Sequence, residues 1–530
     1  MQGGNRMKKI LALVLCFVMA LSCFSGCAAE DTPYVPHGDA LVDEDTDLNI
    51  PTEEAKDPQE LTMVCYLDKS MNPYVSNDFT NRTLFSLMYQ GLFSVSSKYE
   101  AVPILCDSYR VSSTYKIYTF YINDATFSDG TPVTIEDVAA SYEAAVSSKY
   151  YGNRFYQVVK WELNEDDSIT FYLRTPMEDF PLLLDFPILK TSELEAEYPL
   201  GTGPYIFEKN LAGAQLRRNG AWWCSSSDLD ATADIITLVA AESPTQIRDE
   251  FEFADVGIVC ADPCSDTYAD YRCDYELWNC DNGIMVYLGC NVAYSQEDVF
   301  ETITLRSALT YAIDRNELVK DNYNGFARPT AIAMDPAHPY YSEALNAKYA
   351  YDPVKFITAM GMVKLPKDPI RLVVNSDDSM RMRLARNIVN MLTECGLNIE
   401  LKEMPTSKFI SAVKNGNYDL YLGQTRLPAT MDLSEFFRPW GNLSWGSVDN
   451  ENLYNLCKEA LDNHGNFYEL HKALADDGRI IPLLFCGYAV YADRGLVSDL
   501  EPARDNVFFY TLGRTIDDAL IPIDYHNSQG

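Results

Sequence analysis

The stretch FSDGTPVTIEDV, residues 127–138, has the signals of a turn followed by the start of a helix. Asp129 and Gly130 form a turn dipeptide, because glycine adopts positive φ angles at little cost. Thr134 stands where an N-cap is expected, and Asp137 three residues later completes a Thr-x-x-Asp capping box. The apolar residues that follow repeat at the spacing of one buried helical face: Val138, Tyr142, Ala145 and Val146. The stretch therefore predicts architecture, and its acids and hydroxyls need no catalytic role.

Strand-like segments surround this helix, and an alternating α/β pattern follows later in the chain. Residues 115–122 and 167–174 are rich in aromatic and β-branched side chains, as β-strands are. Residues 81–93 predict a helix from the spacing of their apolar side chains. Residues 370–423 alternate strand, helix, strand, helix and strand, which predicts an α/β lobe with parallel pairing and right-handed crossovers. The first helix of that lobe has one apolar face, formed by Leu384, Ile388, Met391 and Leu392.

Length and charge narrow the class of protein. The chain has 530 residues, 47% of them hydrophobic, which predicts two or three packed lobes rather than one core. Its formal net charge of −35 repels phosphate backbones, so we expect no nucleic-acid partner. Solubility is the simplest reason for such an acidic surface.

The first 60 residues have the pattern of an export signal and a tether. Two lysines precede an apolar run over residues 10–24, which is too short for a comfortable membrane span. Small residues followed by Cys27 resemble the cleavage site of a bacterial lipoprotein, in which the cysteine is lipidated and becomes the mature N-terminus. An ordinary cleaved signal is the alternative to a lipoprotein signal over residues 1–27. Residues 28–60 contain eleven Asp or Glu against one Lys, which predicts a disordered acidic tether.

The sequence contains no familiar catalytic motif. It lacks the G-x-S-x-G, H-E-x-x-H and P-loop patterns, and its carboxylates are too numerous for any pair to indicate a glycosidase. No C-x-x-C pair occurs among its 14 cysteines, and the pairing of the 11 that follow residue 27 stays open. His464 and His471 are expected in surface or core positions rather than as metal ligands. We therefore expect a protein that is not an enzyme and that has no catalytic residue, metal site or cofactor.

Five segments line up, in order, with one protein family. They are residues 71–93, 118–143, 201–209 with 217–223, 306–319, and 415–423. FSDGTPVTIEDV, together with AIDR at residues 312–315, is the most specific part of the match. The chain resembles the family 5 extracytoplasmic solute-binding proteins, which serve ABC importers for peptides, nickel and opines. The likeness extends over residues 61–518, nearly all of the chain after the tether.

The resemblance implies a periplasmic-binding-protein-like α/β fold. Two α/β lobes are joined by a hinge, and an extra domain is inserted in the first lobe. The first lobe is expected over residues 61–93, 187–290 and 486–530, the last of which ends in a C-terminal tail. The inserted domain is expected over residues 94–186 and the second lobe over residues 291–485.

The resemblance also implies capture and delivery. The solute, a peptide or a similar small molecule, is buried between two closing lobes and handed to a membrane permease, while other subunits hydrolyse ATP. The protein is expected to be a monomer, held on the outer face of the bacterial cell membrane by a lipid at Cys27. Two alternatives stay open: a family relative that acts as a ligand sensor or surface interaction lipoprotein, and a secreted hydrolase.

The resemblance is weaker in the segment that is expected to recognise the solute. Peptide binders of this family often hold the amino terminus of the ligand with an Asp, which here falls at Pro428 or Ala429, while Asp432 is displaced by several residues. Arg426 lies near the expected pocket wall, where it favours an anionic or carboxylate-bearing solute. The residues expected to line the pocket are Asn77, Phe79, Tyr287, Asn291, Gln424, Thr425, Arg426, Trp440 and Trp445.

Overall fold

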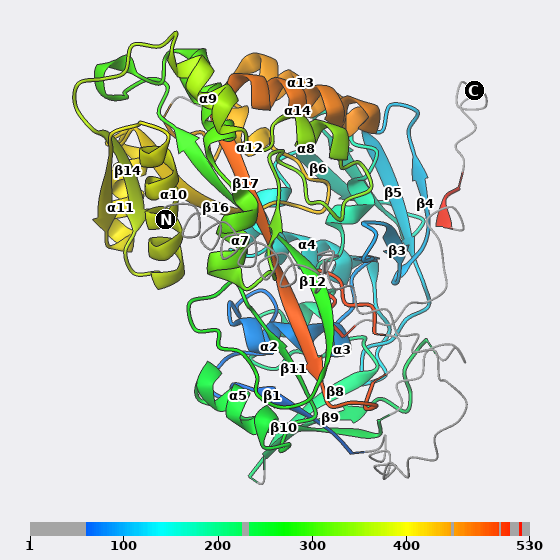
Figure 1. Ribbon diagram of the computed structural model, residues 1–530. Coiled ribbons are helices and arrows are strands. Elements are labelled where there is room, and N and C mark those ends of the chain that lie inside the picture. Colours follow the sequence, from blue (N-terminus) through cyan, green and yellow to red (C-terminus); the bar gives the residue numbers. More distant parts are fainter. Residues whose placement is uncertain are drawn as a thin grey trace, which may run out of the picture. The chain divides into compact units, whose positions relative to one another are not determined.

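The computed structural model of the protein describes residues 60–211, 213–224, 233–446, 450–497, 500–508 and 519–521 (Figure 1). The signal segment with Cys27, and the tether up to residue 59, lie outside the described residues. Within those described ranges, no helix combines the length and apolar character needed to cross a membrane.

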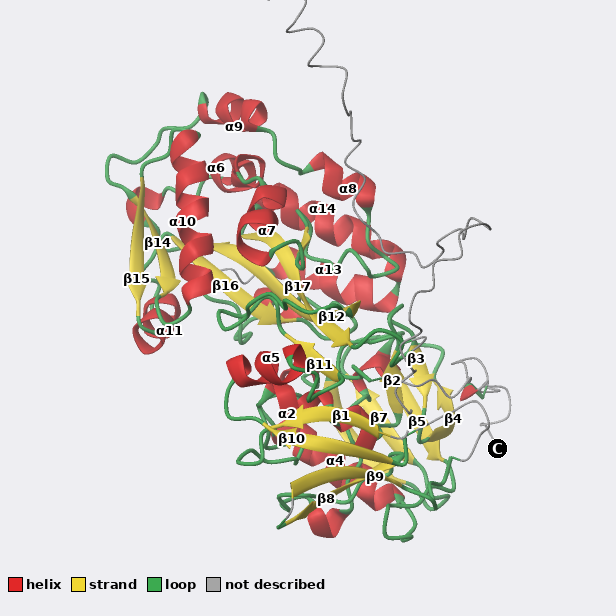
Figure 2. Ribbon diagram, turned by 60° about the horizontal axis from the view of Figure 1, so that its bottom comes forward, coloured by secondary structure: helices red, strands yellow, loops and turns green. Residues whose placement is uncertain are grey.

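A first sheet of four strands has the order β1-β10-β9-β8 (Figure 2). β1 (Glu60–Cys65) pairs in parallel with β10 (Ile235–Ala240). β9 (Gly213–Arg218) and β8 (Tyr205–Asn210) extend the sheet with antiparallel pairing. The helices that follow its strands in the chain are α2 (Phe79–Thr83), α3 (Phe85–Met88) and α5 (Pro244–Glu252).

The single helix predicted over residues 81–93 is wrong in extent. The chain forms α2 and α3 with a break at Leu84, and its backbone becomes extended at Tyr89. The backbone N–H of Gly203 donates to the Met88 carbonyl at 2.9 Å. A Cβ on Gly201 would lie 2.0 Å from the same carbonyl oxygen, so a segment distant in sequence approaches too closely for any residue but glycine. This contact takes the hydrogen-bonding group that a continuing helix would use.

An antiparallel sheet carries the helix that begins in FSDGTPVTIEDV. Its order is β4-β5-β7-β6, with bounds Cys106–Val111, Ile117–Ile122, Ile169–Leu173 and Val158–Leu163, and β2 (Phe93–Val95) pairs with β3 (Ala101–Pro103) beside it. The helix is α4 (Ile135–Ser147), and its capping box is confirmed. The Asp137 N–H donates to the Thr134 hydroxyl at 3.3 Å, and the Thr134 N–H donates to the Asp137 carboxylate at 3.0 Å. Val146 was expected on the buried face but is 42% exposed, because the helix ends one residue later.

Two long neighbouring strands run through the largest sheet. β12 (Glu276–Cys290) and β17 (Ile480–Ala492) pair antiparallel along most of their length, and Figure 1 shows them running side by side. We call this pair the ribbon. β11 (Ile258–Ala261) pairs with the last residues of β17, whereas β16 (Leu420–Arg426) pairs with the second half of β12. The pairing shifts register between Asp281 and Met285, where a bulge interrupts the ribbon.

The α/β pattern predicted over residues 370–423 is confirmed. β14 (Ile370–Asn375) pairs in parallel with both β15 (Ile399–Met404) and β16, and the connecting helices are α10 (Ser379–Glu394) and α11 (Thr406–Lys414). On α10, three of the four predicted face residues are fully buried, and Met391 lies at the edge of the core. The remaining helices are α6 (Ile303–Ala308), α7 (Arg315–Tyr323), α8 (Glu343–Lys348), α9 (Pro353–Met360), α12 (Ser434–Phe437), α13 (Glu451–Asp462) and α14 (Phe467–Asp477), and the short strand β13 (Arg328–Pro329) pairs with β17.

The antiparallel sheet shares a continuous apolar core with α13 and α14. Phe120 and Phe171 of that sheet belong to the same buried cluster as Phe467 and Leu470 of α14. Polar contacts cross the same junction, since the Tyr156 hydroxyl donates to Asp432 at 2.7 Å. The eleven cysteines in the described part of the chain all have free thiols.

Candidate binding site

A concave site with both apolar and charged walls lies where β1 and β11 end. Tyr66 and Asp262 are the first residues after these two strands, and the first turns of α2 and α5 complete the rim. The hollow has a volume of about 250 Å³ and is open to solvent. We call it the Asp262 pocket; its principal lining residues are Tyr66, Asp78, Phe79, Arg248, Asp262, Tyr268 and Tyr271. Ligand sites in α/β proteins commonly form at such carboxyl ends of strands.

Of the residues predicted to line the binding pocket, Phe79 is the one that lines the Asp262 pocket. Its ring lies tilted against that of Tyr488 in β17, with centroids 4.4 Å apart. Asp78 precedes it as the N-cap of α2 and accepts a hydrogen bond from the Asn81 N–H at 2.9 Å. Asn77, also predicted to line the site, is exposed and its amide donates to the Val75 carbonyl at 3.4 Å.

A charged cluster lies on the other side of Tyr488. We call it the Asp505 cluster; its members are Arg82, Tyr150, Arg426 and Asp505. Arg426 Nη2 donates to Asp505 Oδ1 at 3.0 Å, and the Tyr150 hydroxyl donates to the same oxygen. The Tyr150 ring lies between two guanidinium groups, 3.3 Å from Arg82 and 4.6 Å from Arg426. Such cation–π contacts strengthen when they are shielded from water.

The charges of this cluster compensate one another. Burial alone would raise the pKa of Asp505, but the cations Arg426, Arg82 and Arg154 outweigh burial and hold that pKa well below its usual range. Arg154 is itself paired with Asp185. The cluster joins residues of α2, of the segment after α4, of β16 and of the returning segment at 500–508, so it ties four distant parts of the chain together.

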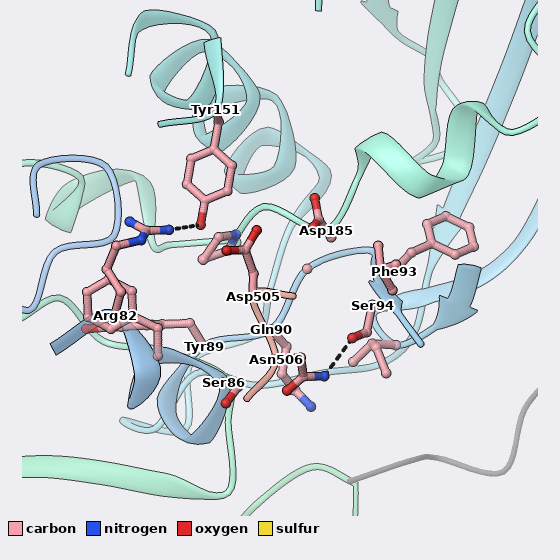
Figure 3. Close-up of a pocket in the computed structure, with 15 residues that line it drawn as sticks. Arg82, Ser86, Tyr89, Gln90, Phe93, Ser94, Tyr151, Asp185, Asp505 and Asn506 are labelled. Atoms are coloured by element: carbon pink, nitrogen blue, oxygen red, sulfur yellow. Dashed lines mark hydrogen bonds between the residues drawn. The ribbon is translucent and has the colours of Figure 1, made fainter. Parts of the chain in front are cut away.

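A smaller cavity adjoins the cluster and is shown in Figure 3. Arg82 and Asp505 lie on its wall, and Arg82 Nη2 donates to the Tyr151 hydroxyl at 2.9 Å. On the opposite side, the Asn506 amide donates to the Ser94 hydroxyl at 2.7 Å. The returning segment therefore forms one wall of this cavity and packs against β2.

Arg426 was expected to favour an anionic solute. In the structure its guanidinium already has a carboxylate partner in Asp505, and its Nε donates to the Asn282 carbonyl at 2.9 Å. An anionic solute at this position would have to displace Asp505, so direct binding by Arg426 stays a prediction.

The other predicted pocket residues are dispersed. Tyr287 and Asn291 are buried, and the Asn291 amide donates to the carbonyls of Gly416 and Tyr418 at 2.9 and 2.8 Å. Gln424 is exposed and Thr425 is half-buried on β16.

The two tryptophans differ in their surroundings. Trp440 is 94% exposed, whereas the half-buried Trp445 packs against Tyr421 with ring centroids 6.0 Å apart. Neither lines the Asp262 pocket, whose walls come from other segments.

Sequence reasoning missed Asp262, Tyr268 and Tyr271. The available signal was IVCAD, a buried strand that ends directly at an acid, but the chain has too many acids for that pattern to stand out. No group of three or more potential ligands for a metal ion occurs among the residues that the structure describes.

Comparison with known proteins decides the family. The model of bacterial extracellular solute-binding proteins, family 5 Middle, matches residues 100–447. The chain belongs to this family. The resemblance inferred from sequence is therefore confirmed, and with it the periplasmic-binding-protein-like α/β fold.

Among curated family 5 relatives, the glutathione-binding protein GsiB of Escherichia coli K12 is 25% identical over 303 residues. That match spans 54% of this chain and only 57% of GsiB. The relatives are binding proteins rather than enzymes.

Two solved structures have the same fold. The ABC transporter substrate-binding protein CtaP of Listeria monocytogenes has a TM-score of 0.69 at 18% identity, over 85% of this chain and 97% of CtaP. The oligopeptide-binding protein AppA of Bacillus subtilis, solved with a nonapeptide, has a TM-score of 0.61 at 18% identity, over 84% of this chain and 97% of AppA.

Proposed function

We propose that this family 5 protein is the extracytoplasmic solute-binding lipoprotein of an ABC importer, and that it captures a peptide or a similar small solute between two closing lobes. One observation carries the proposal beyond family membership: the Asp262 pocket lies against the ribbon. Two wall residues touch β17: the Phe79 ring lies tilted against that of Tyr488 with centroids 4.4 Å apart, and the Tyr268 hydroxyl hydrogen-bonds that of Tyr491 at 2.7 Å. In this proposal a solute on these walls acts on the ribbon through those two contacts.

In this proposal the lobes have the predicted bounds: residues 61–93, 187–290 and 486–530 for the first, 94–186 for its inserted domain, and 291–485 for the second. The residues that line the Asp262 pocket then all belong to the first lobe, and the second lobe closes over the solute that they hold. The hinge is the bulged part of the ribbon between Asp281 and Met285. Gly283 has a φ of +69° there, a conformation that side chains disfavour. Interrupted pairing leaves this part of the backbone freer to bend than the paired strands on either side.

Delivery follows from closure. The closed, solute-loaded form docks on the permease in the membrane, and opening of the lobes releases the solute to it. No step of this cycle requires a catalytic residue of this chain, because capture and release are shifts between two conformations.

Anchoring is the part of the proposal that rests on sequence alone. A lipid on Cys27 and the acidic tether over residues 28–60 hold the body of the protein outside the membrane. We expect that Cys27→Ala releases the protein from the membrane fraction of expressing cells and abolishes incorporation of labelled lipid. Continued labelling of the variant would refute anchoring at Cys27.

Solute capture is tested by mass spectrometry of the natively purified protein, which identifies any bound compound. Thermal denaturation of the protein with each identified compound follows. Because a solute that binds only the folded form stabilises it by RT ln(1 + [L]/Kd), saturation at about 100 times Kd is expected to add about 2.7 kcal/mol. A co-purified peptide would support the proposal. If no compound co-purifies and no member of a peptide and small-solute panel raises the melting temperature, the proposed function is wrong.

A further inference from the structure

We propose that the Asp262 pocket takes a positively charged group of the solute, an ammonium or a guanidinium attached to an apolar body, with Asp262 as its counter-ion. This inference rests on the proposed function and adds the chemical class of the solute. It is carried by the absence of a cation beside Asp262 and by the aromatic walls around it.

Asp262 has no cationic partner among the residues that the structure describes. Within the described ranges its carboxylate accepts one hydrogen bond, from the Cys264 N–H to Oδ1 at 2.9 Å, and Oδ2 accepts none. No lysine, arginine or histidine in those ranges lies within ion-pair distance of it. A half-buried carboxylate without a counter-charge is costly, and a bound cation removes that cost.

The electrostatic surroundings of Asp262 point the same way. Burial, and to a smaller extent the nearby charge of Asp378, raise the pKa of Asp262 to about 6. Asp378 is the N-cap of α10, and its own ion pair with Arg381, at 3.1 Å, occupies the nearest cation on that helix. The neighbouring groups Cys260 and Tyr488 bring no positive charge.

Arg248 lies on the same pocket wall but does not neutralise Asp262. Its Nη2 donates to Asp249 at 2.9 Å, and its Nε lies 3.9 Å from Glu252. Asp78 contributes a second carboxylate to the wall. Burial raises its pKa, and the N–H groups of α2 and the nearby charge of Lys69 offset this only in part. With Arg248 paired elsewhere, the pocket has an excess of negative charge.

The start of α5 also borders the pocket, and a helix N-terminus favours anions. That preference is weak at an accessible site and is screened by salt. Ser243 already caps the helix, since its hydroxyl accepts from the Gln246 N–H at 3.2 Å. The uncompensated carboxylates therefore decide the sign of the preferred charge.

The aromatic walls suit a cation on an apolar body. Rings from three segments line the pocket: Tyr66, Phe79, Tyr268 and Tyr271. Tyr268 is held in place by a hydrogen bond between its hydroxyl and that of Tyr491 at 2.7 Å. Faces of such rings attract ammonium and guanidinium groups and also bury methylene carbons.

This position differs from the one at which family peptide binders often hold the ligand amine. There the chain has Pro428 and Ala429, and Ala429 is fully buried. Asp262 directly follows β11, a different strand of the same sheet as β16. It supplies a carboxylate at a different place from Pro428 and Ala429.

The test compares Asp262→Asn with Asp266→Asn, an exposed acid of the same loop that does not line the pocket. The probes are two matched pairs of tripeptides: Phe-Leu-Ala with a free or an acetylated amino group, and acetyl-Arg-Leu-Ala or acetyl-citrulline-Leu-Ala. Titration calorimetry of the protein at neutral pH measures its affinity for each probe. We expect the charged member of at least one pair to bind about 10-fold or more tighter than its neutral partner. Asp262→Asn is expected to remove that difference, while Asp266→Asn keeps it.

Two further readouts separate binding from a structural role. In the free protein, Asp262→Asn is expected to keep or raise the melting temperature, because the substitution removes an uncompensated charge. In the wild type, affinity for the charged probe is expected to fall as pH drops through about 6, because protonated Asp262 no longer attracts a cation, and the Asn variant is expected to lose this dependence.

The outcomes distinguish the inference from the proposed function. If neutral and charged probes bind equally, or if Asp262→Asn leaves the charge preference intact, the inference is wrong while solute binding stands. If none of the four probes binds the wild type, the inference is also overturned, and the proposed function is then judged by the co-purified compound alone.

Discussion

His471 makes the stability of the folded protein sensitive to acid. Its side chain is 2% exposed on α14, and neither ring nitrogen has a hydrogen-bond partner in the described part of the chain. Burial, with a smaller contribution from His338, lowers its pKa from 6.5 to about 3. The folded protein therefore keeps this ring neutral at pH values at which the unfolded chain protonates it.

The sign and size of the effect follow from this difference. Above the unfolded pKa of 6.5 the ring is neutral in both states and costs no stability. As pH falls from 6.5 toward about 3, the unfolded chain binds a proton that the folded protein does not, so the free energy of unfolding decreases. At about pH 4.5, two pH units below the unfolded value, the loss is about 2.7 kcal/mol, since each unit is worth about 1.36 kcal/mol. His471→Leu removes the titrating group and keeps an apolar side chain of similar size.

The assay is urea denaturation at about pH 7 and about pH 4.5, which gives the free energy of unfolding of each variant at both pH values. We expect the free energy of unfolding of His471→Leu to fall by about 2.7 kcal/mol less than that of the wild type on acidification. His464→Leu is the matched control, because Asp179 accepts from His464 at 2.8 Å and raises its pKa despite partial burial, so that removing His464 acts with the opposite sign. Equal acid losses in the wild type and in His471→Leu would refute this reasoning.

Two further predictions concern the ion pair and the helix cap. Arg426→Met leaves Asp505 without its nearest cation and is expected to cost about 2–3 kcal/mol of unfolding free energy, whereas Arg386→Met, in an exposed pair with Glu403, is expected to cost less than about 1 kcal/mol. Similar losses in the two variants, measured by denaturant titration, would contradict a special role for the Asp505 cluster. Thr134→Ala removes the cap of α4 and is expected to cost about 1 kcal/mol, with recovery in Thr134→Ser; an unchanged transition midpoint in the alanine variant would count against the cap.

Local signals were sufficient wherever a feature depends on neighbours in sequence. The capping box of Thr134 and Asp137 involves residues three apart, and both of its hydrogen bonds are present. The strands and helices over residues 370–423 likewise follow from periodicity and turn residues. The family match depends on similar short motifs and is confirmed.

Contacts between distant segments were not predictable from one sequence. The helix over residues 81–93 ends early because Gly201 and Gly203 approach the backbone of Met88 from more than a hundred residues away. The Asp262 pocket combines segments near residues 66–80, 244–248 and 260–271, and none of them has a distinctive motif. Burial of Asn291 and pairing of Arg426 with Asp505 likewise depend on which segments meet in the fold.

The ribbon also has a mechanical consequence. β12 and β17 pair antiparallel at eleven residue pairs, so a force that pulls the lobes apart along the strands loads these hydrogen bonds in shear, and many must break together. At the bulge this ribbon pairing is interrupted, and β12 is held there from its other side, where the Leu427 N–H donates to the Gly283 carbonyl at 2.9 Å. In the proposed two-lobe arrangement the connection therefore resists stretching along the strands, and a cut in one strand at the bulge would leave the lobes joined by the other.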